Sequence, residues 1–273
     1  MPADLSGVRR KLARAKDKLD KLSDAVKPYL DTTPFRIEVD VQGNHQAVVC
    51  RVDPEPEESW ADDMAEIAYQ ARSALDLLIP QLVVASGNPI KGGTSFPISR
   101  DQAAYVTPGR GGVSQRDKML KGVGSKYRKI IEDFQPYQRG RSAWRDPLAA
   151  LQTISNRDKH NDVYVCVAAA ETFAVKIVRP PLPPPDNEIT IRFGDKLIPY
   201  AMTDGQDMFA LDWNPDPANA QQPMMDLIRI ELLDIKPTLG FSSEGRTFLL
   251  DDLNRGVLVA SQIVDKCAAR IKS

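Results

Sequence analysis

Both ends of the chain carry an apolar seam, and these two seams constrain the fold more than any other feature. Apolar residues near the N-terminus recur at alternating steps of three and four: Leu5, Val8, Leu12, Ala15, Leu19, Leu22, Val26 and Tyr29. A similar series closes the chain: Leu253, Val257, Ala260, Val264, Cys267 and Ile271. This spacing places one apolar stripe along a helix. We expect two terminal helices that pack together or cover the same core. An intermolecular coiled coil is the alternative, although about three heptads is near its lower limit.

Two central helices carry charges on their apolar sides. The first is expected from about Trp60 to Ser86, and Arg72 falls inside its apolar arc with Asp76 at the edge. The second should start at Asp146-Pro147 and end near His160. A charge that faces a core is costly unless it is paired. We therefore expect Arg72 to pair with Asp158 or Asp76, in a structural polar cluster of four residues: Arg72, Asp76, Asn156 and Asp158.

Runs of β-branched residues predict strands in the rest of the chain. A hairpin is expected over residues 34–52 around Gly43-Asn44, and further strands over 163–170, 172–178, 188–193 and 226–232. The fold class is α+β: a helical bundle with an inserted antiparallel β-sheet and a closing C-terminal helix. The expected parts are a mainly helical region with the hairpin inserted (1–160), a β-rich insertion (161–247) and the closing helix (248–273).

Three patches resemble the signatures of a widespread, uncharacterised family of bacterial and phage proteins. They are Arg72-Ser-Ala-Leu-Asp76-Leu-Leu, Phe96-Pro97-Ile98 and Asn156-Arg-Asp-Lys-His160. More remotely, a helix with Arg-x-x-x-Asp followed by a helix ending in Asn, Arg and His is similar to HEPN domains. Many of these are metal-independent RNases that act as dimers, some in bacterial defence or stress. Leu77 stands where the bacterial and phage family usually has His.

The resemblance to HEPN nucleases implies a catalytic set of Arg157, Lys159 and His160. His160 would act as general base on a ribose hydroxyl, and Arg157 or Lys159 would stabilise the charge on the phosphorane. Only two residues separate Arg157 from His160, whereas HEPN nucleases place four to six between their Arg and His. The alternative is that His160 caps a helix C-terminus. His45, the other histidine, falls in the expected hairpin turn.

The near-neutral chain contains one strongly basic stretch. Residues 110–145 hold ten basic and three acidic residues, a net charge of +7. Tyrosine, tryptophan and glycine are interleaved with the cations, as in sites for single-stranded nucleic acid. The candidate binding residues are Arg110, Lys126, Tyr127, Arg128, Lys129, Arg139, Arg141 and Arg145. The alternative is a set of solvated helix faces whose charges pair with acidic neighbours.

Hydropathy and cysteine spacing exclude broad classes of protein but do not identify a function. No segment has the length and hydropathy of a membrane span, and the three cysteines are scattered. We expect a cytoplasmic protein without metal or cofactor, which binds RNA or single-stranded DNA and forms a homodimer through its helices. Two alternatives stay open: a HEPN-like RNase and a non-enzymatic scaffold or interaction protein.

Overall fold

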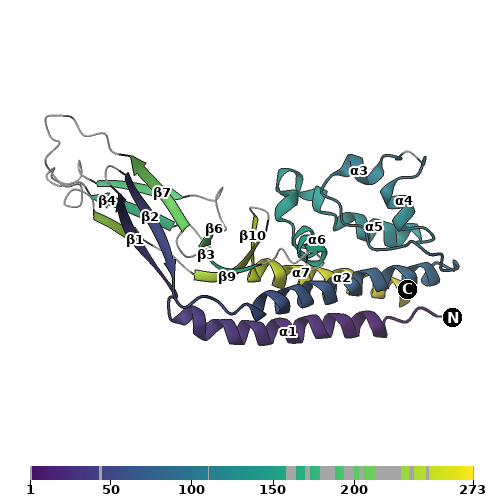
Figure 1. The fold of residues 1–273 in the computed structure, drawn as a ribbon. Coiled ribbons are helices and arrows are strands. Elements are labelled where there is room, and N and C mark those ends of the chain that lie inside the picture. The colour runs from purple at the N-terminus through teal and green to yellow at the C-terminus, as the bar shows by residue number, and fades with distance from the viewer. Residues whose placement is uncertain are drawn as a thin grey trace, which may run out of the picture. The chain divides into compact units, whose positions relative to one another are not determined.

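The computed structural model describes residues 2–42, 45–109, 111–157, 164–169, 173–178, 188–193, 200–202, 206–212, 229–233, 237–243 and 246–272. The chain divides into two compact units (Figure 1). The helical unit comprises Met1–Asp24, Ser59–Val163 and Leu250–Ser273, and the β unit comprises Ala25–Glu58 and Tyr164–Leu249. Each unit is described by itself.

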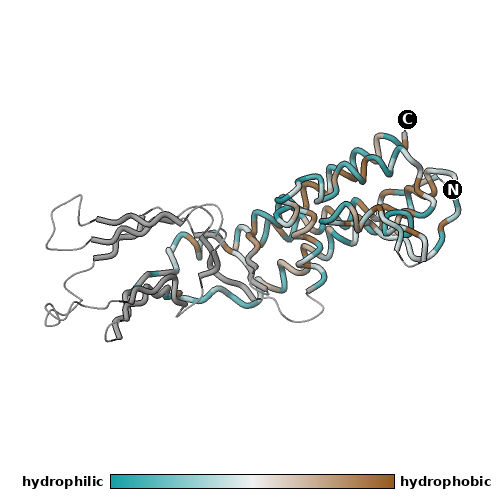
Figure 2. Tube along the Cα trace, turned by 90° about the horizontal axis from the view of Figure 1, so that it is seen from above, coloured by the Kyte–Doolittle hydropathy of each residue, from teal (hydrophilic) through white to brown (hydrophobic). Residues whose placement is uncertain are grey.

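Three long helices form the frame of the helical unit, namely α1 (Ser6–Asp31), α2 (Ser59–Ala85) and α7 (Leu250–Lys272). The N-terminal part of α1 contacts the other two. Lys18 of α1 forms an ion pair with Asp63 of α2 at 3.4 Å, and Arg9 lies 3.9 Å from Asp265 of α7. The central residues of both expected seams are buried: Val8, Leu12, Ala15, Leu19, Leu22 and Val26 in α1, and Leu253, Val257, Ala260, Val264 and Cys267 in α7. The end residues of the seams, Leu5, Tyr29 and Ile271, are half-buried. Figure 2 shows the alternation of hydrophobic and hydrophilic residues along these helices.

A shorter helix, α6 (Pro147–Arg157), packs against both α2 and α7. Its start is fixed as the sequence predicts, because an Asp146 carboxylate oxygen accepts the N–H of Leu148 at 2.9 Å. Gly256 allows α7 to approach α6 closely: a Cβ at this position would lie only 2.6 Å from Cγ of Leu151. The absence of a side chain is therefore what permits this helix crossing.

Four short helical segments connect α2 to α6: α3 (Gln102–Val106), α4 (Gln115–Met119), α5 (Ser125–Asp133) and the 3₁₀ segment η1 (Pro136–Arg145). The sequence predicts short helices around Ser114–Leu120 and Ser125–Phe134, which α4 and α5 confirm, and it predicts neither α3 nor η1. Both α3 and α4 are capped by the residue before them. A carboxylate oxygen of Asp101 accepts the N–H of Ala103 at 2.7 Å, and the hydroxyl of Ser114 accepts the N–H of Asp117 at 3.0 Å.

The β unit contains three antiparallel sheets in the part of the chain described, where one inserted sheet was expected. The first has the order β1 (Phe35–Gln42), β2 (His45–Val52), β7 (Gln206–Asp212). The second is β10 (Arg246–Leu249), β9 (Pro237–Ser243), β3 (Tyr164–Ala169), β6 (Tyr200–Met202). The third is β5 (Glu188–Phe193), β4 (Phe173–Val178), β8 (Arg229–Leu233). The α+β class is confirmed.

The hairpin β1–β2 differs from its expected place in the domain organisation. It was assigned to the mainly helical region 1–160, but β2 pairs with β7 from Cys50↔Gln206 to His45↔Asp212. This pairing satisfies the outer edge of β2 and makes the hairpin part of the β unit. The N-terminal region therefore contributes to both units.

No helix within the described ranges has enough consecutive apolar residues to cross a bilayer. The proline-rich residues 179–185, which the sequence predicts to form an extended connector, residues 43–44 and residues 158–163 lie outside the described residues.

Candidate functional site

The residues expected to be catalytic are only partly covered by the structure. Helix α6 ends at Arg157, and Asp158, Lys159 and His160 lie outside the described residues. Asn156 is exposed in the last turn of α6. The arrangement of the expected catalytic set is therefore untested. His45 does not sit in a hairpin turn, because it is the first residue of β2.

The expected charge pair on α2 is present, and both of its side chains also form hydrogen bonds with the backbone of Phe96. Nη2 of Arg72 lies 3.1 Å from Oδ1 of Asp76. The same Nη2 donates to the carbonyl of Phe96 at 2.6 Å, while the N–H of Phe96 donates to Oδ1 of Asp76 at 2.9 Å. One turn of α2 thus satisfies both backbone groups of Phe96, which is itself fully buried. We name these three residues the Phe96 clamp.

Burial governs the electrostatics of the Phe96 clamp. The Arg72 side chain is 16% exposed and that of Asp76 38%. Desolvation lowers the pKa of Arg72, while the carboxylate of Asp76 opposes the shift. Among the residues that the structure describes, Nη1 of Arg72 has no hydrogen-bond partner. The pairing of Arg72 with Asp76 is confirmed, and the alternative pairing with Asp158 falls on a residue outside the described ranges.

The buried residues that follow Phe96 are held by a side chain that sequence reasoning missed. Gln135, 1% exposed, accepts the N–H of Ser99 at 2.9 Å and donates to the carbonyl of Pro97 at 2.9 Å. Its amide nitrogen also donates to the carbonyl of Ile131 at 3.1 Å. Two of the three patches that carry the family resemblance, on α2 and around Phe96, thus meet in a structural arrangement. A single glutamine between a helix and a proline gives no periodic signal in the sequence.

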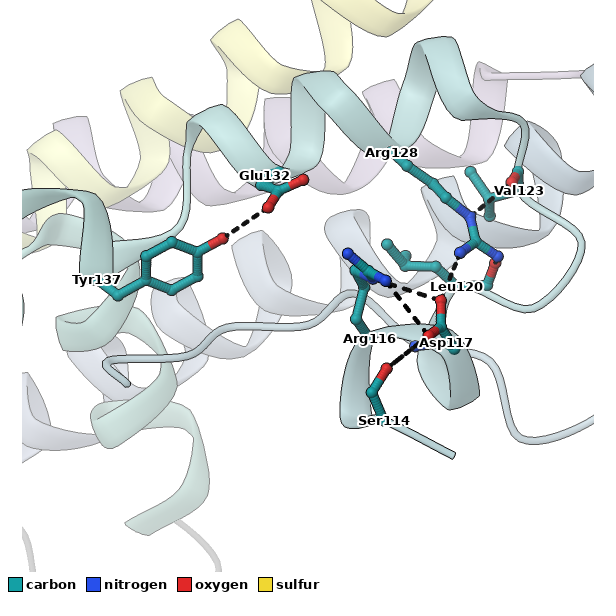
Figure 3. A network of polar contacts seen from close by, with 8 residues as sticks. All are labelled: Ser114, Arg116, Asp117, Leu120, Val123, Arg128, Glu132 and Tyr137. Atoms are coloured by element: carbon teal, nitrogen blue, oxygen red, sulfur yellow. Dashed lines mark hydrogen bonds and ion pairs between the residues drawn. The ribbon is translucent and has the colours of Figure 1, made fainter. Parts of the chain in front are cut away.

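Most candidate nucleic-acid-binding cations within 111–145 are engaged inside the helical unit. Figure 3 shows one network of these contacts, which includes Asp117 and Arg128. Arg128 uses all three of its nitrogens: Nη1 on Asp117 at 2.7 Å, Nη2 on the carbonyl of Leu120 at 2.8 Å and Nε on that of Val123 at 2.8 Å. This guanidinium therefore holds the turn between α4 and α5.

Asp117 receives three side chains in the same network (Figure 3). The Ser114 hydroxyl donates to it at 2.7 Å, and Nε of Arg116 lies at 3.3 Å. These hydrogen bonds, the one from Ser114 first and those from Arg116 and Arg128 after it, lower the pKa of Asp117 to about 2. The carboxylate is consequently ionised throughout the physiological range.

Two tyrosines lie beside this network. The hydroxyl of Tyr137 donates to Glu132 at 3.2 Å (Figure 3), and burial followed by the Glu132 charge raises its pKa to about 12. The Tyr105 ring lies 5.5 Å from that of Tyr137, and Tyr105 is fully buried. Its hydroxyl has no hydrogen-bond partner among the described residues, and burial raises its pKa. Neither phenol is ionised near neutral pH.

Other cations of the basic stretch also have structural partners. Lys126 donates to the carbonyl of Arg270 at 2.7 Å and the hydroxyl of the buried Tyr127 does so at 3.3 Å, which satisfies a carbonyl in the last turn of α7. Lys129 pairs with Asp133 at 2.7 Å along α5. These residues serve the fold, whether or not their charges also attract a ligand.

The last part of η1 is different, because its polar side chains face solvent. Arg141, Ser142, Trp144 and Arg145 are exposed. Trp144 is 41% exposed, and the Arg145 guanidinium lies over its ring at 4.7 Å from the ring centroid. We refer to residues 141–145 as the Trp144 turn. Arg110 lies outside the described residues.

No metal centre is indicated in the part of the chain described, where no three His, Cys, Asp or Glu side chains gather in a way that could hold an ion. In comparisons with known proteins, no family model, no curated sequence and no solved structure matches the chain.

Proposed function

We propose that the chain is a nucleic-acid-binding protein that acts without catalysis, and that the Trp144 turn is its principal contact. The observation that carries this proposal is the combination of an exposed indole, a guanidinium stacked on it and a second exposed arginine within five residues. Cations bind phosphate oxygens and aromatic rings bind bases, so this composition suits a polyanion that also carries rings.

The surrounding charge supports this proposal. Over residues 111–146, nine basic residues stand against four acidic ones, a net charge of +5. Four of these cations form ion pairs within the segment: Arg116 and Arg128 with Asp117, Lys129 with Asp133, and Arg139 with Asp146. The net charge already includes these three carboxylates. A local positive field of this kind raises the association rate of a polyanion even when some cations are structurally engaged.

The HEPN-like RNase is the second candidate function, and it rests on the sequence resemblance of residues 156–160. It makes a separate prediction, namely that purified protein cleaves RNA without added metal and that His160→Ala abolishes the cleavage. A binding protein without catalysis leaves the RNA intact in both forms.

Fluorescence anisotropy with labelled single-stranded nucleic acid (RNA and DNA) and with labelled duplex DNA tests the proposal. We expect binding to at least one of them, with an affinity that falls linearly on a log–log plot as salt rises. Arg141→Gln should weaken binding and reduce the salt slope by roughly 0.7–0.9, the value for one phosphate contact. Arg14→Gln is the matched control, since Arg14 is an exposed arginine of α1. Absence of salt-dependent binding to any of these probes would refute the proposal.

A further inference from the structure

We infer that the nucleic acid bound by this protein is single-stranded and that one of its bases stacks on Trp144. The inference rests on the proposed function and deepens it by naming the ligand class. Three observations carry it: the rigid attachment of the Trp144 turn, the face that its side chains share and the exposure of the indole.

The Trp144 turn is attached at both of its ends. Before it, Nε of Arg139 binds Oδ2 of the buried Asp146 at 2.6 Å, which joins the two flanks of the turn. The other carboxylate oxygen of Asp146 caps α6 through the N–H of Leu148. Within the turn, Ala143 is only 6% exposed and anchors the segment. The exposed side chains are therefore presented from a fixed backbone, which reduces the ordering cost of binding.

The backbone conformation brings Arg141 and Trp144 to the same side. Gly140 has φ +55°, a left-handed conformation that interrupts η1. A second 3₁₀ turn starts after it, at Arg141. Residues three apart eclipse each other in a 3₁₀ helix, so Arg141 lies in line with Trp144. A phosphate at Arg141 and a base at Trp144 can thus belong to one strand.

The exposure of the indole favours an unpaired base over a duplex. Trp144 is 41% exposed beside Arg145, which leaves part of its surface accessible to a ligand. Bases inside a duplex are stacked on one another, so their faces are not accessible to a side chain. Single strands expose those faces, and stacking on an aromatic residue tolerates any sequence. Arg145, already over the ring, adds a cation–π contribution.

The experiment compares three labelled DNA probes of equal length in anisotropy titrations with the full chain: a single strand, its duplex and a strand whose central nucleotides are abasic. We expect the single strand to bind most tightly. Trp144→Ala should weaken its binding about 5- to 100-fold, the usual effect of removing one base-stacking side chain. Trp144→Phe should retain most of the affinity, because it keeps an aromatic face.

Tyr69→Ala is the matched control, since Tyr69 is also exposed, at 44%, and also carries a cation over its ring, Lys11 at 5.1 Å. It should leave binding unchanged. The inference is overturned if duplex and abasic probes bind as tightly as the single strand, or if Tyr69→Ala and Trp144→Ala have equal effects. The probe comparison uses unaltered protein, so it decides the matter even if a variant misfolds. If neither these DNA probes nor the RNA probe of the preceding experiment binds, the proposed function itself is refuted.

Discussion

Replacement of Arg72 by methionine tests the Phe96 clamp most directly. Methionine keeps an unbranched side chain but removes the guanidinium, which leaves the carbonyl of the buried Phe96 and the carboxylate of Asp76 without this donor. Removal of one partner of a fully buried ion pair costs about 3–5 kcal/mol, and loss of a hydrogen bond to a charged group about 1.5–3 kcal/mol. Because the Asp76 side chain is 38% exposed and regains some water, we expect the lower part of this range, about 2–3 kcal/mol.

Thermal and urea unfolding followed by circular dichroism measure this loss. For a unit of this size, about 2–3 kcal/mol corresponds to a fall in Tm of roughly 5–10 °C. Arg14→Met, at an exposed site on α1, is the control and should change the free energy of unfolding by less than about 0.5 kcal/mol. If Arg72→Met is as mild as this control, the clamp does not stabilise the fold and the reasoning fails.

A double-mutant cycle separates the ion pair from the backbone contacts. Asp76→Asn alone leaves a buried guanidinium without its counter-ion, whereas the double variant Arg72→Met/Asp76→Asn removes both charges. We expect the double variant to lose about 1–2 kcal/mol less than the sum of the single losses. The remaining loss reports the weakened hydrogen bonding of the Phe96 backbone.

Three further predictions concern the helical unit. Gly256→Ala should cost about 1–3 kcal/mol, because its Cβ would overlap Leu151, and Leu151→Ala in the same chain should recover part of this loss in a thermal melt. Gln135→Leu should lower the free energy of unfolding by about 2–4 kcal/mol in urea titrations, since it leaves two buried backbone groups of residues 97–99 unpaired; a loss under about 0.5 kcal/mol would contradict this. The pKa of Asp117 is depressed in the folded state, so its contribution to stability is present above pH 3.8 and disappears as the pH falls toward about 2. Asp117→Asn should therefore lose stability at neutral pH and flatten the acid limb of the stability curve.

Amphipathic helices were the most predictable part of the fold. In α1 (26 residues) and α7 (23 residues), a single seam that follows most of the helix leaves little choice of structure or buried face. The cap at Asp146 likewise located the start of α6, because a side chain that binds a backbone N–H is a local interaction.

Strands were less predictable, and their pairing was least predictable of all. β9 begins with Pro237 and contains Gly240, two residues that are depleted in strands, and β6 is only three residues long. The pairing of β2 with β7 joins positions more than 150 residues apart. Such long-range pairing depends on which sheet edges are free in the folded chain. A local pattern of apolar residues does not predict which edges these are.

The candidate site shows why the charge of a segment is a poor guide to its ligand. An arginine has a limited number of hydrogen-bond donors. When all three of its nitrogens donate to protein oxygens, it attracts a ligand through its charge alone. Arg128 is in this position, whereas Arg141 is exposed and has no ion pair or hydrogen bond among the described residues. Both contribute one positive charge to the same basic stretch, yet only Arg141 can form the direct hydrogen bonds that orient a phosphate. Arg128→Gln should therefore destabilise the fold far more than Arg141→Gln, while Arg141→Gln should weaken nucleic-acid binding at unchanged Tm. The opposite ordering, measured by thermal melts and anisotropy on the same two proteins, would show that donor use does not distinguish structural from binding arginines here.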